Sequence, residues 1–297
     1  MRRKGLPVDG VLLLDKPYAV TSNAALQTAR KLLNAQKAGH TGTLDPLASG
    51  LLAITFGEAT KFSADLLLAD KTYEAKIGLG RTTTTGDLEG EFISESEVSA
   101  TEADIEAVLE QFRGDIMQTP PMFSALKRDG KTLYDLARDG VSIDLEPRQV
   151  HIAELVMLSY EECTLTVRVT CSKGTYIRVL AEDIGKALGC GAYLKALRRT
   201  AVGPLSLSEA VELQALRDMA PEERLAQLKP LDALMQTLEA VYLTEEQCTR
   251  FCHGQRLAMG LEPCDRVRVY GPAPKLYKLY YHFGAQKKMW YGWKRDS

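Results

Sequence analysis

The chain contains 297 residues, a length that predicts two domains or one large domain. Its composition, 45% hydrophobic and 26% charged, is typical of a globular protein and excludes a disordered chain, a collagen and a coiled coil. The formal net charge of −2, taken alone, argues against a polyanionic partner such as a nucleic acid.

The N-terminus starts with basic residues, as a secretory signal does, but its apolar run ends at Asp15 and is too short for a signal peptide. No stretch approaches the roughly 18 apolar residues of a membrane-spanning helix. The six cysteines show no regular spacing, which is typical of reduced thiols. We therefore expect a soluble, cytoplasmic protein without membrane association.

Hydrophobic periodicity predicts strands and helices in the first half of the chain. A short buried strand at 11–14 is followed by a helix that begins near the N-cap candidates Thr21-Ser22-Asn23 and ends at about Leu33. Strands are predicted at 51–56 and 72–79. A further helix follows the N-cap Thr101, because Ile105, Val108, Leu109 and Phe112 have helical spacing.

The second half continues the pattern. Two strands are predicted at 150–158 and 163–171, and an amphipathic helix at 175–188. Because strands and helices do not alternate strictly, we predict an α+β fold with a mixed, largely antiparallel sheet flanked by helices. A helix at 243–252 and strands at 266–270 and 276–283 indicate a small C-terminal β-domain, so we expect domains at 1–238 and 239–297.

The charge is unevenly distributed along the chain. Residues 1–61 carry a net +4, residues 62–240 a net −11 and residues 241–297 a net +5. The stretch from Asp87 to Glu110 has nine carboxylates and no Lys or Arg, which predicts an acidic loop followed by a helix. The C-terminal segment interleaves basic and aromatic residues, a pattern that suits RNA binding and equally suits packing in a small β-domain.

The loop from Gly39 to Gly50, G-H-T-G-T-L-D-P-L-A-S-G, presents a single carboxylate, Asp45. Its glycines permit positive φ angles and close ligand approach, and Pro46 stiffens the backbone. An Asp that merely caps a turn is an alternative from these residues alone. No nucleotide-phosphate motif is present. A zinc site is disfavoured by irregular spacing of its candidate ligands, which are Cys248, Cys252, His253 and Cys264.

Five further stretches accompany this loop in order, and together the set resembles the TruB family of tRNA pseudouridine-55 synthases over residues 10 to about 203. The stretches are Asp15-Lys16-Pro17 with Thr21-Ser22-Asn23, Lys71-Thr72-Tyr73-Glu74-Ala75, QTPPMFSALKRDGKTLY from Gln118 to Tyr134, SKGTYIRVLAEDIG from Ser172 to Gly185, and Leu197-Arg198-Arg199-Thr200. The chain departs from the family pattern at Ala19, where the family usually carries Gly.

The resemblance implies a pseudouridine-synthase catalytic domain followed by a small PUA-like RNA-binding domain. It implies isomerisation of one uridine in the tRNA T-loop (position 55): the glycosidic C–N bond breaks, the uracil rotates while bound, and a C–C bond forms through C5. The target nucleotide must leave the stack for this chemistry. No cofactor and no metal are expected, the partner is the T-arm stem-loop of tRNA, and we expect a monomer.

The resemblance also assigns roles to residues. Asp45 is the implied essential carboxylate, a choice that general chemistry supports, because cleaving a glycosidic bond builds oxocarbenium character that a carboxylate stabilises or traps. These residues leave open whether Asp45 attacks C1′ or removes a sugar proton to give a glycal. The resemblance further implies substrate-binding residues: Arg178 is the cationic partner of Asp45, and Tyr73 lies against the uracil. Tyr176 and Leu197 enclose the base. His40 stacks in the gap left by the extruded nucleotide, and Lys16 is a phosphate or active-site contact.

The segment at about 119–148, with Lys127, Arg128, Lys131 and Arg138, resembles the RNA-gripping insertion of the family. A second class of function stays open at this point, a tRNA-binding or remodelling protein without turnover. The combination of Asp45, Tyr73 and Arg178 favours the enzyme, because a carboxylate facing RNA would not help a pure binder.

Overall fold

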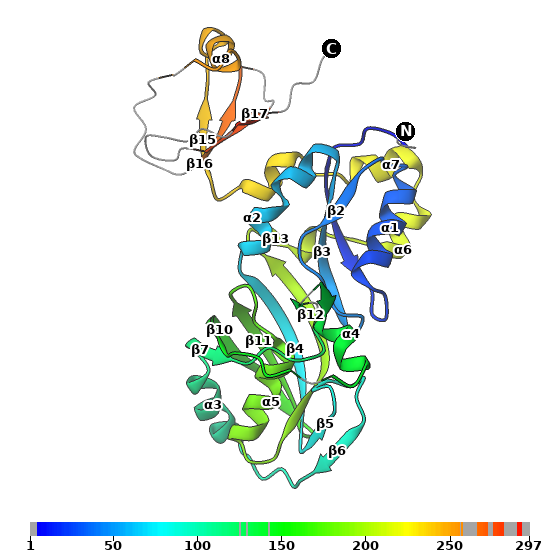
Figure 1. The fold of residues 1–297 in the computed structure, drawn as a ribbon, viewed down its shortest axis with the longest axis vertical. Coiled ribbons are helices and arrows are strands. Elements are labelled where there is room, and N and C mark those ends of the chain that lie inside the picture. Colours follow the sequence, from blue (N-terminus) through cyan, green and yellow to red (C-terminus); the bar gives the residue numbers. More distant parts are fainter. Residues whose placement is uncertain are drawn as a thin grey trace.

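The structure is a computed structural model that describes residues 5–124, 126–128, 130–141, 143–255, 257, 266–272, 276–281 and 290–292. A long twisted sheet forms the body of the molecule, and a smaller sheet near the C-terminus stands apart from it (Figure 1).

The main sheet has ten strands and is largely antiparallel, which confirms the predicted class. Its order is β14-β1-β3-β12-β4-β11-β10-β7, with β2 beside β3 and β13 beside β12. Only the pairs β1–β14 and β3–β12 are parallel. The strands are β1 (Gly10–Lys16), β2 (Ala38–His40), β3 (Ala48–Phe56), β4 (Lys71–Leu79), β7 (Gly114–Gln118), β10 (Arg148–Glu161), β11 (Thr164–Cys171), β12 (Ala192–Val202), β13 (Leu205–Ser206) and β14 (Val211–Glu212).

Two helices begin at the N-caps that the sequence predicts. The hydroxyl of Thr21 accepts a hydrogen bond from the Ala24 N–H, and Thr101 forms a capping box with Asp104. The helices are α1 (Ser22–Leu32), α2 (Ser63–Leu68), α3 (Glu102–Gln111), α4 (Leu133–Arg138), α5 (Ile177–Ala187), α6 (Leu213–Asp218), α7 (Pro221–Ala226) and α8 (Glu245–Cys252), with 3-10 turns η1 (Gly57–Phe62), η2 (Leu207–Glu209) and η3 (Leu231–Met235).

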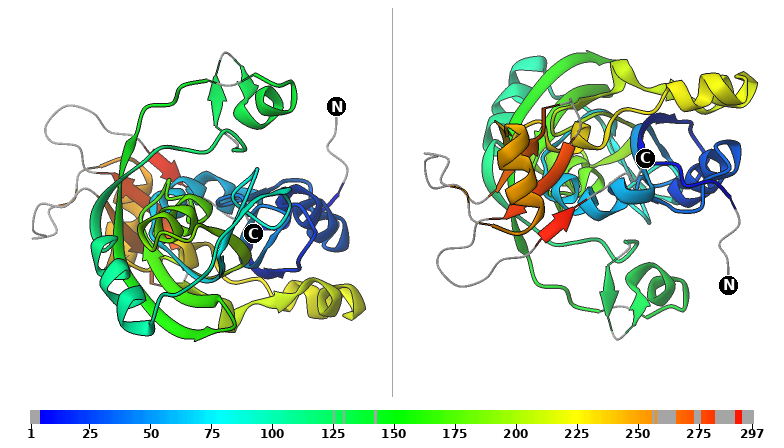
Figure 2. Two further views of the ribbon diagram at one scale, coloured as in Figure 1. Left: turned by 90° about the horizontal axis from the view of Figure 1, so that it is seen from below. Right: turned by 90° about the horizontal axis from the view of Figure 1, so that it is seen from above.

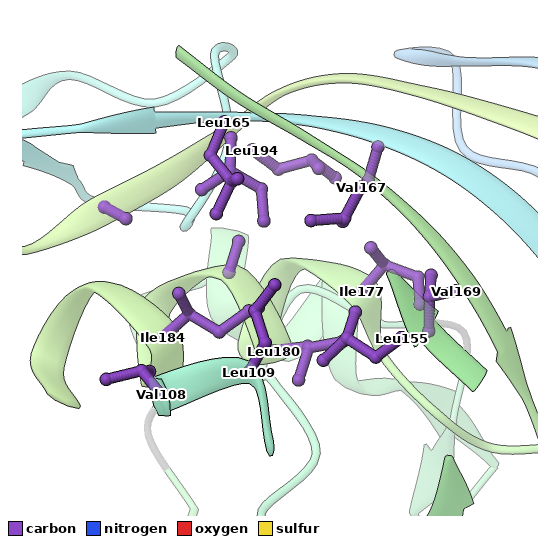
Figure 3. Close-up of a cluster of buried hydrophobic side chains, with 14 of the residues drawn as sticks. Val108, Leu109, Leu155, Leu165, Val167, Val169, Ile177, Leu180, Ile184 and Leu194 are labelled. Atoms are coloured by element: carbon purple, nitrogen blue, oxygen red, sulfur yellow. The ribbon is translucent and has the colours of Figure 1, made fainter. Parts of the chain in front are cut away.

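One core lies between the sheet and helices α3 and α5. Figure 3 shows Ile177, Leu180 and Ile184 of α5 pointing toward Leu165 and Val167 of the sheet. This spacing places all three helix side chains on one face. Each fully buried side chain of this size stabilises the fold by about 1.5–3 kcal/mol, so the contact fixes the position of α5 on the sheet.

The other half of the sheet is covered on both faces. On β1, Leu12 and Leu14 pack in a cluster with α1 and α6, whereas Val11 and Leu13 pack in a cluster with η1, α2 and η3. A strand buried on both faces needs no polar alternation. This explains why the run at 11–14 is continuously apolar.

Strand β12 lies between β3 and β4 and brings three distant segments together. In its register, Arg199 pairs with Gly50 of β3 on one side and with Tyr73 of β4 on the other. Gly50 has φ +100°, and a Cβ there would lie 2.3 Å from the Arg199 carbonyl oxygen. Only glycine permits this close approach.

The C-terminal sheet has the order β15-β16-β17-β18. Its strands are β15 (Glu239–Tyr242), β16 (Arg266–Tyr270), β17 (Leu276–Tyr281) and β18 (Trp290–Gly292). Val241, Val267 and Val269 of the sheet pack with Cys248 and Phe251 of α8. The predicted helix and strands are therefore confirmed as far as residue 281, and the predicted strand end at 282–283 lies outside the described residues.

Two short hairpins complete the chain, β5 (Arg81–Thr83) with β6 (Phe92–Glu95) and β8 (Lys127–Arg128) with β9 (Lys131–Thr132). Strand β6 of the first hairpin lies in the segment predicted as an acidic loop. There the ring of Phe92 contacts the ring of the distant Tyr193 edge-on at 5.3 Å, and the guanidinium of Arg81 in β5 lies over the Phe92 ring at 5.2 Å. These contacts order the hairpin, whereas the predicted helix of this segment is present as α3.

The second hairpin, together with α4, projects away from the main sheet in both views of Figure 2.

Among the helices of the described residues, none combines the length and apolar character needed to cross a membrane.

We expect Gly50→Ala to lower the free energy of unfolding by about 3 kcal/mol or more, because the new methyl group meets backbone that cannot move aside. Gly114→Ala is the matched control: its φ is +83°, but nothing lies within 4 Å of the added Cβ. That control should cost only about 1–2 kcal/mol. Urea denaturation of both variants measures the difference, and equal losses would contradict the close-approach argument.

Candidate active site

Asp45 lies on a loop between two buried leucines. The neighbouring Leu44 and Leu47 are buried, at 3% and 4% exposure, whereas the Asp45 side chain is 57% exposed. Burial of the two leucines on either side fixes the direction in which the carboxylate points. The loop therefore presents one acidic group to solvent from a rigid backbone.

The backbone on both sides of Asp45 is held by the segment that follows β1. The buried Ser22 hydroxyl donates to the Leu44 carbonyl at 2.9 Å and accepts from the Leu44 N–H at 2.8 Å. The Ala19 N–H donates to the Pro46 carbonyl at 2.9 Å. Ala19 has φ +61°, so the turn keeps the left-handed conformation that favours the glycine usual in the family.

The guanidinium of Arg178 is the cation that faces Asp45. Its Nη2 donates to Asp45 Oδ2 at 3.4 Å and to the Phe123 carbonyl at 2.6 Å. Its Nη1 donates to the Thr85 carbonyl at 3.3 Å and forms an ion pair with Asp87 Oδ2 at 3.0 Å. The Arg178 side chain is only 10% exposed, so these four acceptors determine where its charge lies.

Asp87 is the buried partner of this arginine and was not among the predicted site residues. Its side chain is 4% exposed. Its second carboxylate oxygen, Oδ1, accepts from the Thr85 hydroxyl at 2.6 Å and from the Glu89 N–H at 3.1 Å. In the sequence it is one of nine carboxylates in an acidic run, and no local signal separates it from its exposed neighbours.

Tyr176 immediately precedes α5 and is held by its backbone. The side-chain amide of the buried Gln118 accepts from the Tyr176 N–H at 3.0 Å and donates to the Tyr176 carbonyl at 3.3 Å. Gln118 ends β7, directly before the projecting segment. It therefore ties the base of that segment to the start of the helix that carries Arg178.

Tyr73 and Leu197 lie on the adjacent strands β4 and β12. Both side chains are partly buried and pack against the core that includes α5. Burial raises the pKa of the Tyr73 hydroxyl, so the phenol stays protonated at neutral pH. The two side chains provide an apolar, partly accessible surface next to the Asp45 loop.

His40 is the last residue of β2 and Lys16 the last residue of β1. The His40 Nδ1 is buried and has no hydrogen-bond partner in the part of the chain that the structure describes, and burial lowers the pKa of its ring. Lys16 is completely buried and donates to the carbonyls of Pro17 at 2.9 Å and Val20 at 2.6 Å. Burial lowers the pKa of Lys16 to about 8, with the Asp45 charge acting in the opposite direction.

Of the predicted site residues, the structure thus brings Asp45 and Arg178 into direct contact and places Tyr73 and Lys16 within electrostatic reach of Asp45. Among the described residues, no group of three or more His, Cys, Asp or Glu is placed to hold a metal ion. Cys264, one of the candidate zinc ligands, lies outside the described residues. An ionised carboxylate beside a fixed guanidinium is suited to stabilise or attack an electron-poor carbon.

Comparison with known proteins finds one family. Residues 30–177 match the TruB family pseudouridylate synthase (N terminal domain), and residues 178–242 match the tRNA pseudouridylate synthase B C-terminal domain. The tRNA pseudouridine synthase B of Burkholderia lata is 58% identical over 269 residues, which are 89% of this chain and 84% of that protein. The protein of the same name from Dechloromonas aromatica is 54% identical over 91% of this chain and 90% of its own length.

Two solved structures share the fold over nearly the whole chain. The crystal structure of a Cbf5-Nop10-Gar1 complex has a TM-score of 0.71 and 28% identity, and covers 96% of this chain and 84% of that chain. The structure of an H/ACA RNP bound to a substrate RNA containing 2′-deoxyuridine has a TM-score of 0.68 and 26% identity, and covers 95% and 83%.

We expect Asp87→Asn to slow uridine isomerisation in a tRNA transcript by about tenfold or more, because a buried arginine without its charged partner no longer holds its position beside Asp45. The matched control is Glu89→Gln, which removes an exposed carboxylate from the same loop. Single-turnover rates of both variants test this expectation. If Glu89→Gln is as slow as Asp87→Asn, the rate depends on the total charge of the loop, and the contact between Asp87 and Arg178 does not explain it.

The lowered pKa of Lys16 predicts that the stability of the protein depends on pH. Its pKa is about 8 in the folded chain against 10.5 for a free lysine, so between these values the unfolded state binds more protons than the native state. Burying the charged ammonium therefore lowers the free energy of unfolding by its full amount below pH 8. As the pH rises from 8 to 10.5 this penalty disappears, so the free energy of unfolding increases. Urea denaturation of the wild type and of Lys16→Met from pH 7 to pH 10 measures the difference. We expect it to shift in favour of the wild type, and parallel curves would contradict the assignment.

Proposed function

Because the chain belongs to the TruB family and is therefore a pseudouridine synthase, an isomerase that acts on tRNA, we propose that its target is the uridine at position 55 in the T-loop. The observation that supports the site most directly is the contact between the exposed carboxylate of Asp45 and the buried guanidinium of Arg178. We propose further that the protein acts as a monomer, in the cytoplasm, without a cofactor.

In this proposal Asp45 is the essential carboxylate. The C1′–N1 bond of the target uridine breaks with its electron pair going to the uracil, and the Asp45 carboxylate meets the electron-poor sugar, either by bonding to C1′ or by taking a sugar proton to give a glycal. Arg178 supports both routes, because a fixed cation at 3.4 Å limits the orientation of the carboxylate.

The second half of the reaction needs the uracil to rotate without leaving. Its C5 then bonds to C1′. In the first route this breaks the bond between Asp45 and C1′ and frees the carboxylate, and in the glycal route Asp45 returns the proton to the sugar. The proton on C5 is then lost to restore the ring. Tyr73 and Leu197 are proposed to enclose the base, with the Tyr73 ring against the uracil and its hydroxyl near the departing proton. Tyr176 completes the enclosure from the start of α5.

The target nucleotide must be extruded from the T-loop before this chemistry, because C1′ and C5 are not accessible inside a stacked loop. We propose that His40 fills the place of the extruded nucleotide. The projecting segment within residues 119–148 is proposed to grip the RNA. Its Lys131 is exposed, and the Phe123 carbonyl connects its base to Arg178.

We propose that residues 1–238 form the catalytic domain and residues 239–297 a PUA-like RNA-binding domain. The distribution of charge supports RNA binding by both ends of the chain. Residues 1–61 carry a net +4 and residues 241–297 a net +5, and they flank an acidic middle. RNA binding needs a local basic surface and not a basic protein.

The decisive variant is Asp45→Asn, which keeps the shape of the side chain and removes its charge. We expect tRNA affinity within about threefold of the wild type and a loss of pseudouridine formation of about a thousandfold or more, because the reaction loses its essential group. Tritium release from [5-³H]uridine in a T-arm stem-loop, with filter binding in parallel, measures both.

Two results would contradict the proposal. Substantial turnover by Asp45→Asn would remove Asp45 from the chemistry, and wild-type protein that binds tRNA without turnover would support the binding or remodelling function. Mapping pseudouridine in tRNA from cells with and without the protein tests the position, and a modified uridine outside the T-loop would overturn the proposed target.

A further inference from the structure

Arg199 is a buried arginine to which the proposed mechanism gives no role. Its residue exposure is 1%, and it lies in the middle of β12. Arginine is almost never fully buried unless it is paired. Yet none of the carboxylates in the described residues forms an ion pair with it. Its partners are two backbone carbonyls and one phenol.

The two carbonyls lie before and after Asp45 in the chain. The Arg199 Nη2 donates to the carbonyl of Gly42 in the Asp45 loop at 3.2 Å, and Nε donates to the carbonyl of Leu51 in β3 at 2.8 Å. A single planar group therefore connects the part of the loop before the carboxylate to the strand that follows it. The hydrogen bonds from Ser22 and Ala19 hold the residues next to Asp45, and Arg199 holds the chain further out on both sides.

The phenol belongs to Tyr73. The two residues face each other in the register of β12 and β4, so their side chains emerge on the same face of the sheet, and the guanidinium interacts electrostatically with the phenol. Because the guanidinium has no acceptor atom, it presents its N–H groups to the hydroxyl oxygen.

We propose that Arg199 is a positioning residue for the isomerisation, one guanidinium that sets the Asp45 loop and the Tyr73 hydroxyl at a fixed distance from each other. This inference rests on the roles proposed for Asp45 and Tyr73. Two carbonyls and a phenol around one group match the rigid fork of an arginine, whereas the single ammonium of a lysine cannot face all three in the same geometry.

A role in folding alone would give a different result. The place of β12 between β3 and β4 is already determined by backbone pairing over several residues on each side. The guanidinium adds contacts only to the two carbonyls and to the phenol. Changing its geometry while keeping its charge is therefore expected to affect the reaction rate more than tRNA affinity.

The test uses Arg199→Lys, Tyr73→Phe and the double variant, with single-turnover pseudouridine formation at saturating enzyme, filter binding and thermal melting. We expect Arg199→Lys to fold and to bind tRNA within about threefold of the wild type, and to react about tenfold to a hundredfold more slowly, because small misplacements of reacting groups have effects of this size. Adding Tyr73→Phe should slow Arg199→Lys by less than it slows the wild type, since both changes disturb the same hydroxyl.

Arg168→Met is the matched control, because it removes from the same sheet an arginine whose ion pair with Glu154 is at the surface. It should react like the wild type. If melting shows that Arg199→Lys does not fold, Arg199→Gln takes its place with the same expected loss, and failure of both to fold would overturn the proposal in favour of a purely structural role.

A wild-type rate for Arg199→Lys would also overturn the proposal. If the rate losses of Arg199→Lys and Tyr73→Phe multiply in the double variant, the two residues act independently and the proposed link to Tyr73 is wrong. Asp45→Asn measured in parallel separates this inference from the proposed function. Turnover by Asp45→Asn would refute the function itself, whereas an inactive Asp45→Asn beside a normal Arg199→Lys would refute only the role of Arg199.

Discussion

The close approach of two strand backbones at Gly50 and Arg199 is the constraint on which the rest of the structure depends. A methyl group at Gly50 would lie 2.3 Å from the Arg199 carbonyl oxygen, so the parallel pairing of β3 and β12 needs glycine at this position. That pairing places β12 against both the strand that follows the Asp45 loop and the strand that carries Tyr73. The site is therefore assembled in the middle of the sheet.

Two buried arginines then hold the chain around Asp45. Arg178 reaches Asp45 from α5 and is itself held by Asp87 and by the carbonyls of Thr85 and Phe123. Arg199 reaches the carbonyls of Gly42 and Leu51, before and after Asp45, from the sheet. The exposed carboxylate is thus fixed by groups that are themselves inaccessible, which permits contact with a large substrate without loss of orientation.

Local sequence patterns predicted much of the fold. The N-caps at Thr21 and Thr101, and the helical spacing that places Ile177, Leu180 and Ile184 on one face, are determined by residues close together in the chain. The β5–β6 hairpin was not predicted, because its order depends on contacts between Phe92 and the distant Tyr193. Strand β12 was recognised only as a motif around Leu197, since its long partner strands β3 and β4 are more than a hundred residues away in sequence.

The same division holds for the candidate site. The sequence by itself determined the family and singled out Asp45, Tyr73 and Arg178, because glycine-rich and strand motifs carry these residues in a characteristic order. Only the tertiary structure decided that Asp87 and Arg199 belong beside them. A carboxylate in an acidic run and the second arginine of a strand carry no local signal of burial, and their partners are determined by which strands and loops meet when the sheet forms.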